Sequence, residues 1–206
     1  MKSNLVTKLV LASSLVANFA SANSVFVGFD GVYNIKSELE LDAGNVSGKI
    51  KDSTFGLGLK VGYDFDLFRV YGEYLYKTKA KDSYSDNDGE SLYEWNAHQF
   101  LIGADYTPRL MENFKFVLGA YTGISRLNYE ISTTDIVLGN YDDKVNKTGW
   151  LLGAKIGGIY ELNSNNEIEF GVKGDYVNYG SVSDYDGSLD FTEMNYGLYL
   201  GYNFKF

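Results

Sequence analysis

The feature that most constrains this chain is a spacing of two between apolar residues, which recurs in eight separate runs. In the run from 54 to 65, every second residue is apolar or aromatic, and the residues between are mostly glycine or charged. Successive side chains of a β-strand point to opposite faces of a sheet, whereas a helix requires a period of 3.6 residues. The spacing therefore predicts strands whose two faces meet different surroundings.

The alternation predicts eight strands joined by connections that are long and short in turn. A strand of about 11 residues rises roughly 36 Å, and a tilt of about 40° reduces this to roughly 27 Å, close to the apolar band of outer-membrane barrels. We expect an all-β, eight-stranded antiparallel up-and-down transmembrane β-barrel, with four long external loops, three short turns and both termini in the periplasm. The expected strands are 24–36, 54–65, 68–78, 95–106, 114–126, 148–162, 167–177 and 192–206; the long loops are 37–53, 79–94, 127–147 and 178–191; the turns are 66–67, 107–113 with Pro108, and 163–166.

The first 22 residues have the pattern of a secretory signal peptide. Lys2 and Lys8 supply a positive start, an apolar stretch follows, and Ala20 and Ala22 form the small-x-small pattern that signal peptidase cleaves. We expect a signal peptide at 1–22 and an outer-membrane barrel domain at 23–206.

The polar faces of the predicted strands carry charges of both signs among many glycines. A narrow lumen requires small residues for space and paired charges, because isolated ions in a low dielectric are costly. We therefore expect a lumen plugged by paired charges, with Asp30, Lys60, Arg69, Glu73, Asp105, Lys115, Lys155, Glu169 and Lys173 as its structural network. The other charges expected on this face are Lys36, Asp64, Lys77, Glu161, Glu167, Asp175 and Lys205.

The opposite faces of the strands are apolar and are expected to face lipid. Aromatic residues gather toward both ends of the predicted strands, as in the interfacial girdles of outer-membrane barrels. Glu193 is the one charge expected on this face away from the rim. A soluble, lipocalin-like barrel would have an apolar interior and a polar exterior, and would place these same faces the other way round.

The last strand carries the most specific resemblance to a known family. It alternates apolar residues and closes on a terminal phenylalanine, with Tyr202, Phe204 and Phe206 on one face. This strand, together with the overall pattern of the mature chain, resembles the small outer-membrane β-barrel family that includes the OmpX-like, opacity-protein and OmpA transmembrane-domain types. The resemblance implies that these three residues are the signal recognised by the outer-membrane assembly machinery. The resemblance covers the barrel only, so it implies no peptidoglycan-binding domain.

No motif in the sequence predicts catalysis or a cofactor. A lipid A deacylase of similar fold would require a His-x-Ser pair, but His98 is followed by Gln99 and Phe100. The acidic stretch 82–90 does not match a calcium loop, because aligning Gly89 at the sixth position puts Tyr84 and Trp95 where carboxylates are needed. Cysteine is absent, and the formal net charge of -9 argues against binding nucleic acid. We expect no enzyme activity, no cofactor and no metal site.

Two functional classes remain open from the sequence. The first is a structural or surface-interaction protein of the cell envelope, with a possible role in adhesion, whose external loops meet host or environmental ligands. The second is a narrow, porin-like pore or a small-ligand-binding barrel. In the favoured class the expected partners are outer-membrane lipid, lipopolysaccharide and the assembly machinery, and the expected location is the cell outer membrane.

Overall fold

The computed structural model describes residues 24–42, 47–85, 89–135, 139–184 and 187–206. The described residues are built from antiparallel strands. The expected signal peptide, with Ala20 and Ala22, lies outside the described residues. None of the described residues form a helix long and apolar enough to cross a membrane. The strands are β1 (Ser24–Asp42), β2 (Ser47–Asp64), β3 (Phe68–Ser85), β4 (Gly89–Tyr106), β5 (Arg109–Met111), β6 (Phe114–Asp135), β7 (Gly139–Glu161), β8 (Asn166–Asp184) and β9 (Gly187–Lys205).

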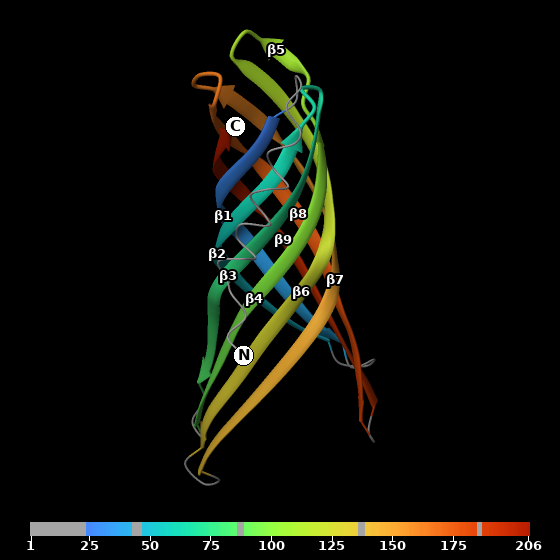
Figure 1. Cartoon of the computed structure of the whole chain (residues 1–206). Coiled ribbons are helices and arrows are strands. Elements are labelled where there is room, and N and C mark those ends of the chain that lie inside the picture. Colours follow the sequence, from blue (N-terminus) through green and yellow to red (C-terminus); the bar gives the residue numbers. More distant parts are fainter. Residues whose placement is uncertain (1–23, 43–46, 86–88, 136–138, 185–186) are drawn as a thin grey trace, which may run out of the picture.

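Eight long strands of the described chain close into one ring (Figure 1). Each strand pairs with its sequence neighbour, β4 pairs with β6 past the short β5, and β1 pairs with β9. Every pairing is antiparallel, so the sheet has no free edge at the level where the ring is complete. This confirms the predicted eight-stranded antiparallel barrel.

The short turns and both described ends of the chain lie at one end of the barrel, the turn end (Figure 1). Asp66 adopts a positive φ of 69° in the first turn, where its backbone N–H donates to the carboxylate of Asp64 at 2.7 Å. Pro108 lies in the second turn, as predicted, but this turn also contains β5, which the sequence did not predict. At the same end, the N–H of Phe206 donates to the carbonyl of Val25.

The four expected long loops are mostly strand, which corrects the sequence prediction. β6 has 22 residues and β7 has 23, and they pair without interruption from Phe114 and Tyr160 to Asp135 and Gly139. A strand of 22 residues rises about 73 Å, or about 55 Å once tilted by about 40°, roughly twice the apolar band. The hairpins therefore continue well past an apolar band of that height.

Beyond the apolar band, the ring separates into two four-stranded sheets. Pairing of β2 with β3 ends at Gly56 and Lys77, and pairing of β7 with β8 ends at Trp150 and Asn178, while the other pairings continue. One sheet is β3–β4–β6–β7 and the other is β8–β9–β1–β2, and Figure 1 shows the two groups of hairpins diverging away from the turn end. We call them the projecting sheets, and the closed part is the barrel base. The projecting sheets comprise 37–42, 47–55, 78–85, 89–96, 126–135, 139–149, 179–184 and 187–193.

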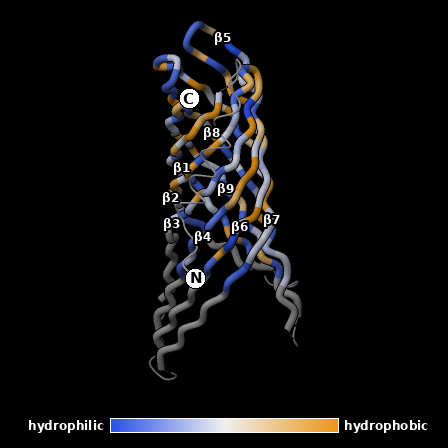
Figure 2. Tube along the Cα trace, viewed as in Figure 1, coloured by the Kyte–Doolittle hydropathy of each residue, from blue (hydrophilic) through white to orange (hydrophobic). Residues whose placement is uncertain are grey.

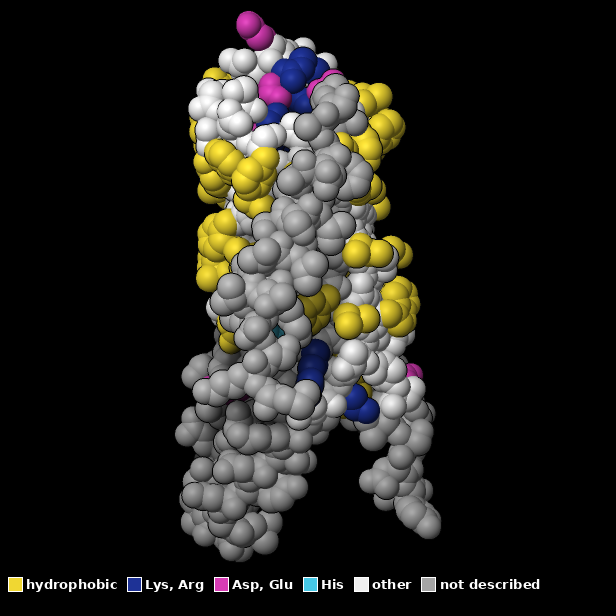
Figure 3. Space-filling view, in the orientation of Figure 1, with side chains coloured by type: hydrophobic (Ala, Val, Ile, Leu, Met, Phe, Trp, Pro, Cys, Tyr) yellow, Lys and Arg dark blue, Asp and Glu magenta, His cyan; other side chains and the backbone are white. Residues whose placement is uncertain are grey.

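The outer face of the barrel base is apolar. Hydropathy alternates along each strand of the base (Figure 2), and hydrophobic side chains cover its flanks while charges gather at the turn end (Figure 3). Ile102 is 66% exposed and Leu59 is 63% exposed on this face. The soluble, lipocalin-like alternative is therefore wrong, because it requires a polar exterior.

A β-bulge in β1 changes which residues point inward. The register of β1 shifts between Asn34 and Ser37, so buried residues are even-numbered before the shift and odd-numbered after it. Lys36, expected in the lumen, is half-buried beside the ring of Tyr196, and Ser37 is buried instead. A one-residue shift reverses the face of every later side chain on a strand.

Candidate functional site

The centre of the lumen contains a chain of five alternating charges. Lys60 Nζ lies 3.1 Å from Asp30 and 3.0 Å from Glu169. Lys155 Nζ lies 2.8 Å from the other oxygen of Glu169 and 2.9 Å from Asp105. All five side chains are buried, and they come from β1, β2, β8, β7 and β4. The chain of ion pairs therefore crosses the lumen and ties strands from opposite walls together.

A second group of charges closes the turn end of the lumen. Arg69, which is 1% exposed, lies 2.7 Å from both Asp64 and Glu167. Lys115 lies 2.9 Å from Asp66 in the turn, and Lys205 lies 2.7 Å from Glu167. Of the nine residues predicted as the lumen network, Arg69 and Lys115 belong to this group and five form the central chain.

Glu73 and Lys173, the remaining two, are buried without an ion-pair partner among the described residues. The Nζ of Lys173 lies 4.8 Å from the centre of the Tyr121 ring, and Glu73 Oε1 has no hydrogen-bond partner in the described structure. Both line a void of about 10 Å³ together with Asp30, Val32, Lys60, Tyr71, Lys155 and Tyr199. The space beside the central chain is thus no larger than about one water molecule.

Tyrosine rings and glycines fill the lumen between the charges. The Tyr71 ring packs on Gly103, where an added Cβ would lie 2.4 Å from the ring, and Tyr121 packs on Gly153 in the same way at 2.3 Å. The Tyr71 ring also lies over Lys155, whose Nζ is 4.6 Å from the ring centre. Glycine in mid-strand therefore makes room for an aromatic ring.

Glu193 belongs to the lumen, contrary to the prediction that placed it on the apolar face. It is 1% exposed, its carboxylate forms an ion pair with Lys77, and it accepts hydrogen bonds from Ser37 and Tyr179 at 2.9 Å each. The signal was present in the sequence, because the apolar residues of this strand from 196 onward are even-numbered and 193 is odd. The prediction ignored this parity at the end of the strand.

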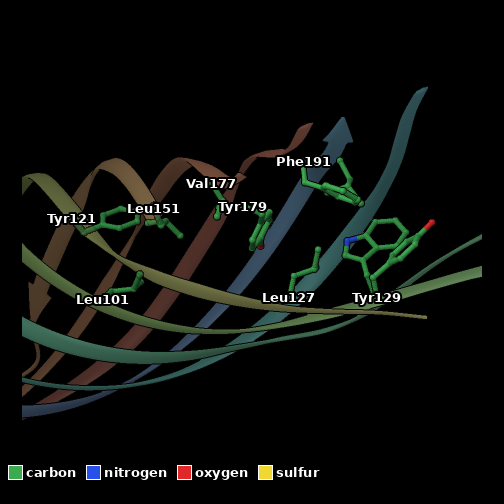
Figure 4. Packing of buried hydrophobic residues seen from close by; sticks show 10 residues of the cluster. Leu101, Tyr121, Leu127, Tyr129, Leu151, Val177, Tyr179 and Phe191 are labelled. Carbon is green, nitrogen blue, oxygen red and sulfur yellow. The ribbon is translucent and has the colours of Figure 1, made fainter. Parts of the chain in front are cut away.

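A cluster of buried apolar residues, which we call the apolar plug, lies on the hairpin side of the lumen and is not predicted from the sequence (Figure 4). Its members come from both projecting sheets and from the adjoining part of the barrel base, and all are buried. They are Leu39, Trp95, Leu101, Tyr121, Leu127, Tyr129, Leu151, Val177, Tyr179 and Phe191. Leu127, Tyr129 and Phe191 alternate with polar neighbours, but they lie within segments that were predicted as loops.

Asp66 and Arg109 extend the charge network to the exposed surface of the turn end. The hydrogen bond and charge of Lys115 lower the pKa of the Asp66 carboxyl below its usual range. A hydrogen bond to Glu161, 2.5 Å away, raises the pKa of the Arg109 guanidinium. Both shifts favour the charged forms that make these contacts.

The residues of the predicted assembly signal lie on the outer face at the turn end. Tyr202 is 45% exposed and donates a hydrogen bond to Asn166, and the rings of Phe204 and Phe206 pack edge to face with centres 5.2 Å apart.

His98 also lies on the outer face, hydrogen-bonded to Tyr74 at 2.8 Å. The described residues contain no group of three His, Cys, Asp or Glu suited to a metal ion.

Neither a protein-family profile nor a curated protein matches this chain. Among solved structures, the outer membrane protease OmpT from Escherichia coli matches with a TM-score of 0.52 at 10% identity, covering 93% of this chain and all of that chain. Outer membrane protein H (OprH) from Pseudomonas aeruginosa matches with a TM-score of 0.50 at 24% identity, covering 89% of this chain and 99% of that chain. Neisserial surface protein A matches with a TM-score of 0.48 at 17% identity, covering 90% of this chain and all of that chain.

The first two likenesses show the fold, which is that of bacterial outer-membrane β-barrels. An apolar belt on the outside of a closed antiparallel barrel is the arrangement that lets strands span this membrane, because every backbone polar group is paired within the ring. The protein is thus a β-barrel of the outer membrane.

Proposed function

We propose that this protein is a sealed, non-catalytic barrel that anchors the two projecting sheets in the outer membrane and presents them to the environment as an interaction surface. One observation carries the proposal: buried ion pairs and a buried apolar cluster lie one above the other inside the barrel, while the strands continue far beyond the apolar belt. Such a barrel serves as a rigid support, and recognition is then expected at the parts outside the membrane.

The side chains inside the barrel support a plug rather than a pore. The charge groups occupy the turn end and the centre, and the apolar plug occupies the hairpin side. The interior void of about 10 Å³ has room for about one water molecule. Larger hollows, of about 760 and 870 Å³, are lined largely by apolar residues of the outer face.

The edges of the projecting sheets support an interaction role. Beyond Gly56 and Lys77, the facing edges of β2 and β3 are not paired with each other, and the hydroxyl of Thr78 bridges the N–H and C=O of Phe55 where the ladder ends. The facing edges of β7 and β8 likewise separate beyond Trp150 and Asn178. Unpaired edges offer backbone donors and acceptors to an added strand. A host or environmental protein with an extended segment is the partner we propose.

The proposal includes four further elements from the sequence. Residues 1–22 are removed as a signal peptide after Ala22. The assembly machinery recognises the final strand through Tyr202, Phe204 and Phe206, and membrane lipid contacts the outer face. The protein has no catalytic activity; in support, His98 is hydrogen-bonded to a tyrosine on the outer face, and the five acids and bases of the central chain bind one another.

Conductance in planar bilayers tests the seal. We expect the refolded mature protein to give no stable conductance steps. Steps with the wild type would overturn the seal and favour the narrow-pore alternative.

Adhesion of bacteria that display the protein tests the interaction role. A trimmed variant, in which a two-residue turn replaces 128–147 of the β6–β7 hairpin, removes one edge of a projecting sheet and leaves the barrel base. We expect it to shift on a gel when boiled, as a folded barrel does, but to lose adhesion to surfaces coated with extracellular-matrix proteins. Equal adhesion by the full and trimmed proteins would contradict the proposal.

A further inference from the structure

A row of four outward-facing residues marks the border between the apolar belt and the projecting sheets. Tyr76, His98, Arg126 and Thr148 lie directly opposite one another on β3, β4, β6 and β7. Residues opposite one another in antiparallel strands bring their Cβ atoms within about 5.5 Å. Arg126 and His98 therefore form adjacent positions on one surface.

The rows on either side of Arg126 have different chemistry. The next row toward the turns is Tyr74, Phe100, Ile124 and Trp150, of which the last three are more than half exposed. The next row toward the hairpin tips contains Asn96 and Asn128, whose amides hydrogen-bond at 2.8 Å. The row of Arg126 thus lies where the apolar belt gives way to polar groups, which is the depth of lipid headgroups.

Arg126 is an exposed cation that has no ion pair with any described residue. The basic residue Lys36, near the same border on β1, differs because it lies 2.5 Å from Glu38. A guanidinium presents five N–H donors in a planar fork that matches the oxygens of a phosphate. The charge of Arg126 is therefore available to a ligand.

His98 is held in place beside Arg126. Its Nδ1 lies 2.8 Å from the hydroxyl of Tyr74, and its ring lies 5.0 Å from that of Tyr76, centre to centre. When the Tyr74 hydroxyl donates to Nδ1, the proton of the neutral imidazole is on Nε2, which can then donate to a second acceptor. The pair thus supplies a charged fork and a fixed neighbouring donor.

We propose that Arg126 and His98 bind a phosphate group of an anionic outer-leaflet glycolipid of the lipid A class, whose acyl chains lie along Phe100, Ile124 and Trp150. The apolar row directly beneath the cation favours a lipid over a free anion, because the ligand must satisfy both rows. This inference deepens the lipid contact of the proposed function, but it does not depend on the sealed lumen or on the projecting sheets.

The test measures binding of bisphosphorylated lipid A to the refolded mature protein in phosphatidylcholine vesicles, with dephosphorylated lipid A and inorganic phosphate as comparison probes. Arg126→Gln is expected to weaken binding about tenfold, the loss of one charge-assisted hydrogen bond. Lys51→Gln is the control for the loss of one positive charge on the surface: the Lys51 side chain, on β2, is 55% exposed, and its Nζ lies 3.8 Å from Glu38. Each variant is first checked for the gel shift on boiling, and conductance is expected to be unchanged in Arg126→Gln.

Each other outcome overturns the proposal in a defined way. Equal binding by Arg126→Gln and wild type would remove Arg126 from the site. Equal binding of lipid A with and without its phosphates would mean that the belt alone holds the lipid. Inorganic phosphate bound with the same dependence on Arg126 would identify a free-anion site. Should Arg126→Gln fail to fold, Arg126→Lys keeps the charge without the fork, and undiminished binding there would show that the fork plays no part.

Discussion

The barrel base and the projecting sheets are built from the same strands but distribute polarity in opposite ways. In the base, β6 points Lys115 inward and Leu118 outward; in the projecting sheets, it points Leu127 inward and Arg126 outward. The base is surrounded by lipid and holds its charges inside, whereas the projecting sheets pack apolar side chains between them, as in a β-sandwich in water. The solvent around each level therefore decides which face of a strand is apolar.

Removing a charge from the base should have the largest effect on stability. Arg69→Leu leaves Asp64 and Glu167 buried without their shared partner, and should lower the free energy of unfolding by about 3 to 5 kcal/mol. Denaturant unfolding in lipid vesicles measures this. Arg109→Leu is the control, because the Arg109 side chain is 44% exposed and its ion pair should contribute less than about 1 kcal/mol. Equal losses would mean that burial of the pair is unimportant.

Opening a cavity in the apolar plug should destabilise the projecting sheets by about 3 kcal/mol, which is typical of buried leucines replaced by alanine. The barrel base should stay closed. Leu127→Ala is the variant, since Leu127 is 1% exposed. Hydrogen exchange should accelerate in the β6–β7 hairpin, and the gel shift on boiling should persist. Leu118→Ala, on the outer face, should leave exchange in that hairpin unchanged. Loss of the gel shift in Leu127→Ala would show that the two regions unfold as one unit.

The two kinds of buried acid in the base should respond differently to loss of charge. Glu73→Gln removes a carboxylate with no ion pair among the described residues and should change the free energy of unfolding by less than about 1 kcal/mol. Glu169→Gln, the control, deprives both Lys60 and Lys155 of a partner and should cost about 3 kcal/mol. A large loss for Glu73→Gln would indicate a role for its charge that the described contacts do not contain.

The smallest effect is expected at the exposed turn. Because folding lowers the pKa of Asp66, its contribution to stability is full above the usual carboxyl pKa and is lost as the pH falls through the lowered value. Asp66 is 76% exposed, so screening limits this contribution to a few tenths of a kcal/mol. The stability difference between wild type and Asp66→Asn should therefore be small at neutral pH and disappear in acid. A difference that grew in acid would reverse the assigned sign.

The sequence predicted the base well and the projecting sheets poorly for one physical reason. Strands in lipid stand out by their apolar outer residues, whereas strands in water have polar outer residues and resemble loops in composition. The ion-pair partners inside the lumen also could not be predicted from the sequence. Lys60 and Glu169 meet across the barrel, and this depends on register and side-chain reach rather than on spacing in the chain. The bulge at Asn34 changed the parity of β1 without a recognisable sequence signal.

The pairing of β1 with β9 has a consequence for the timing of folding. It joins Phe26 to Lys205, nearly the whole chain apart, so the ring cannot close until the last strand is in place. Until then β1 has an open edge, and the apolar belt has no lipid to cover it. Before closure the chain therefore exposes both unpaired backbone groups and apolar side chains, and this is the stage at which it is most prone to aggregate.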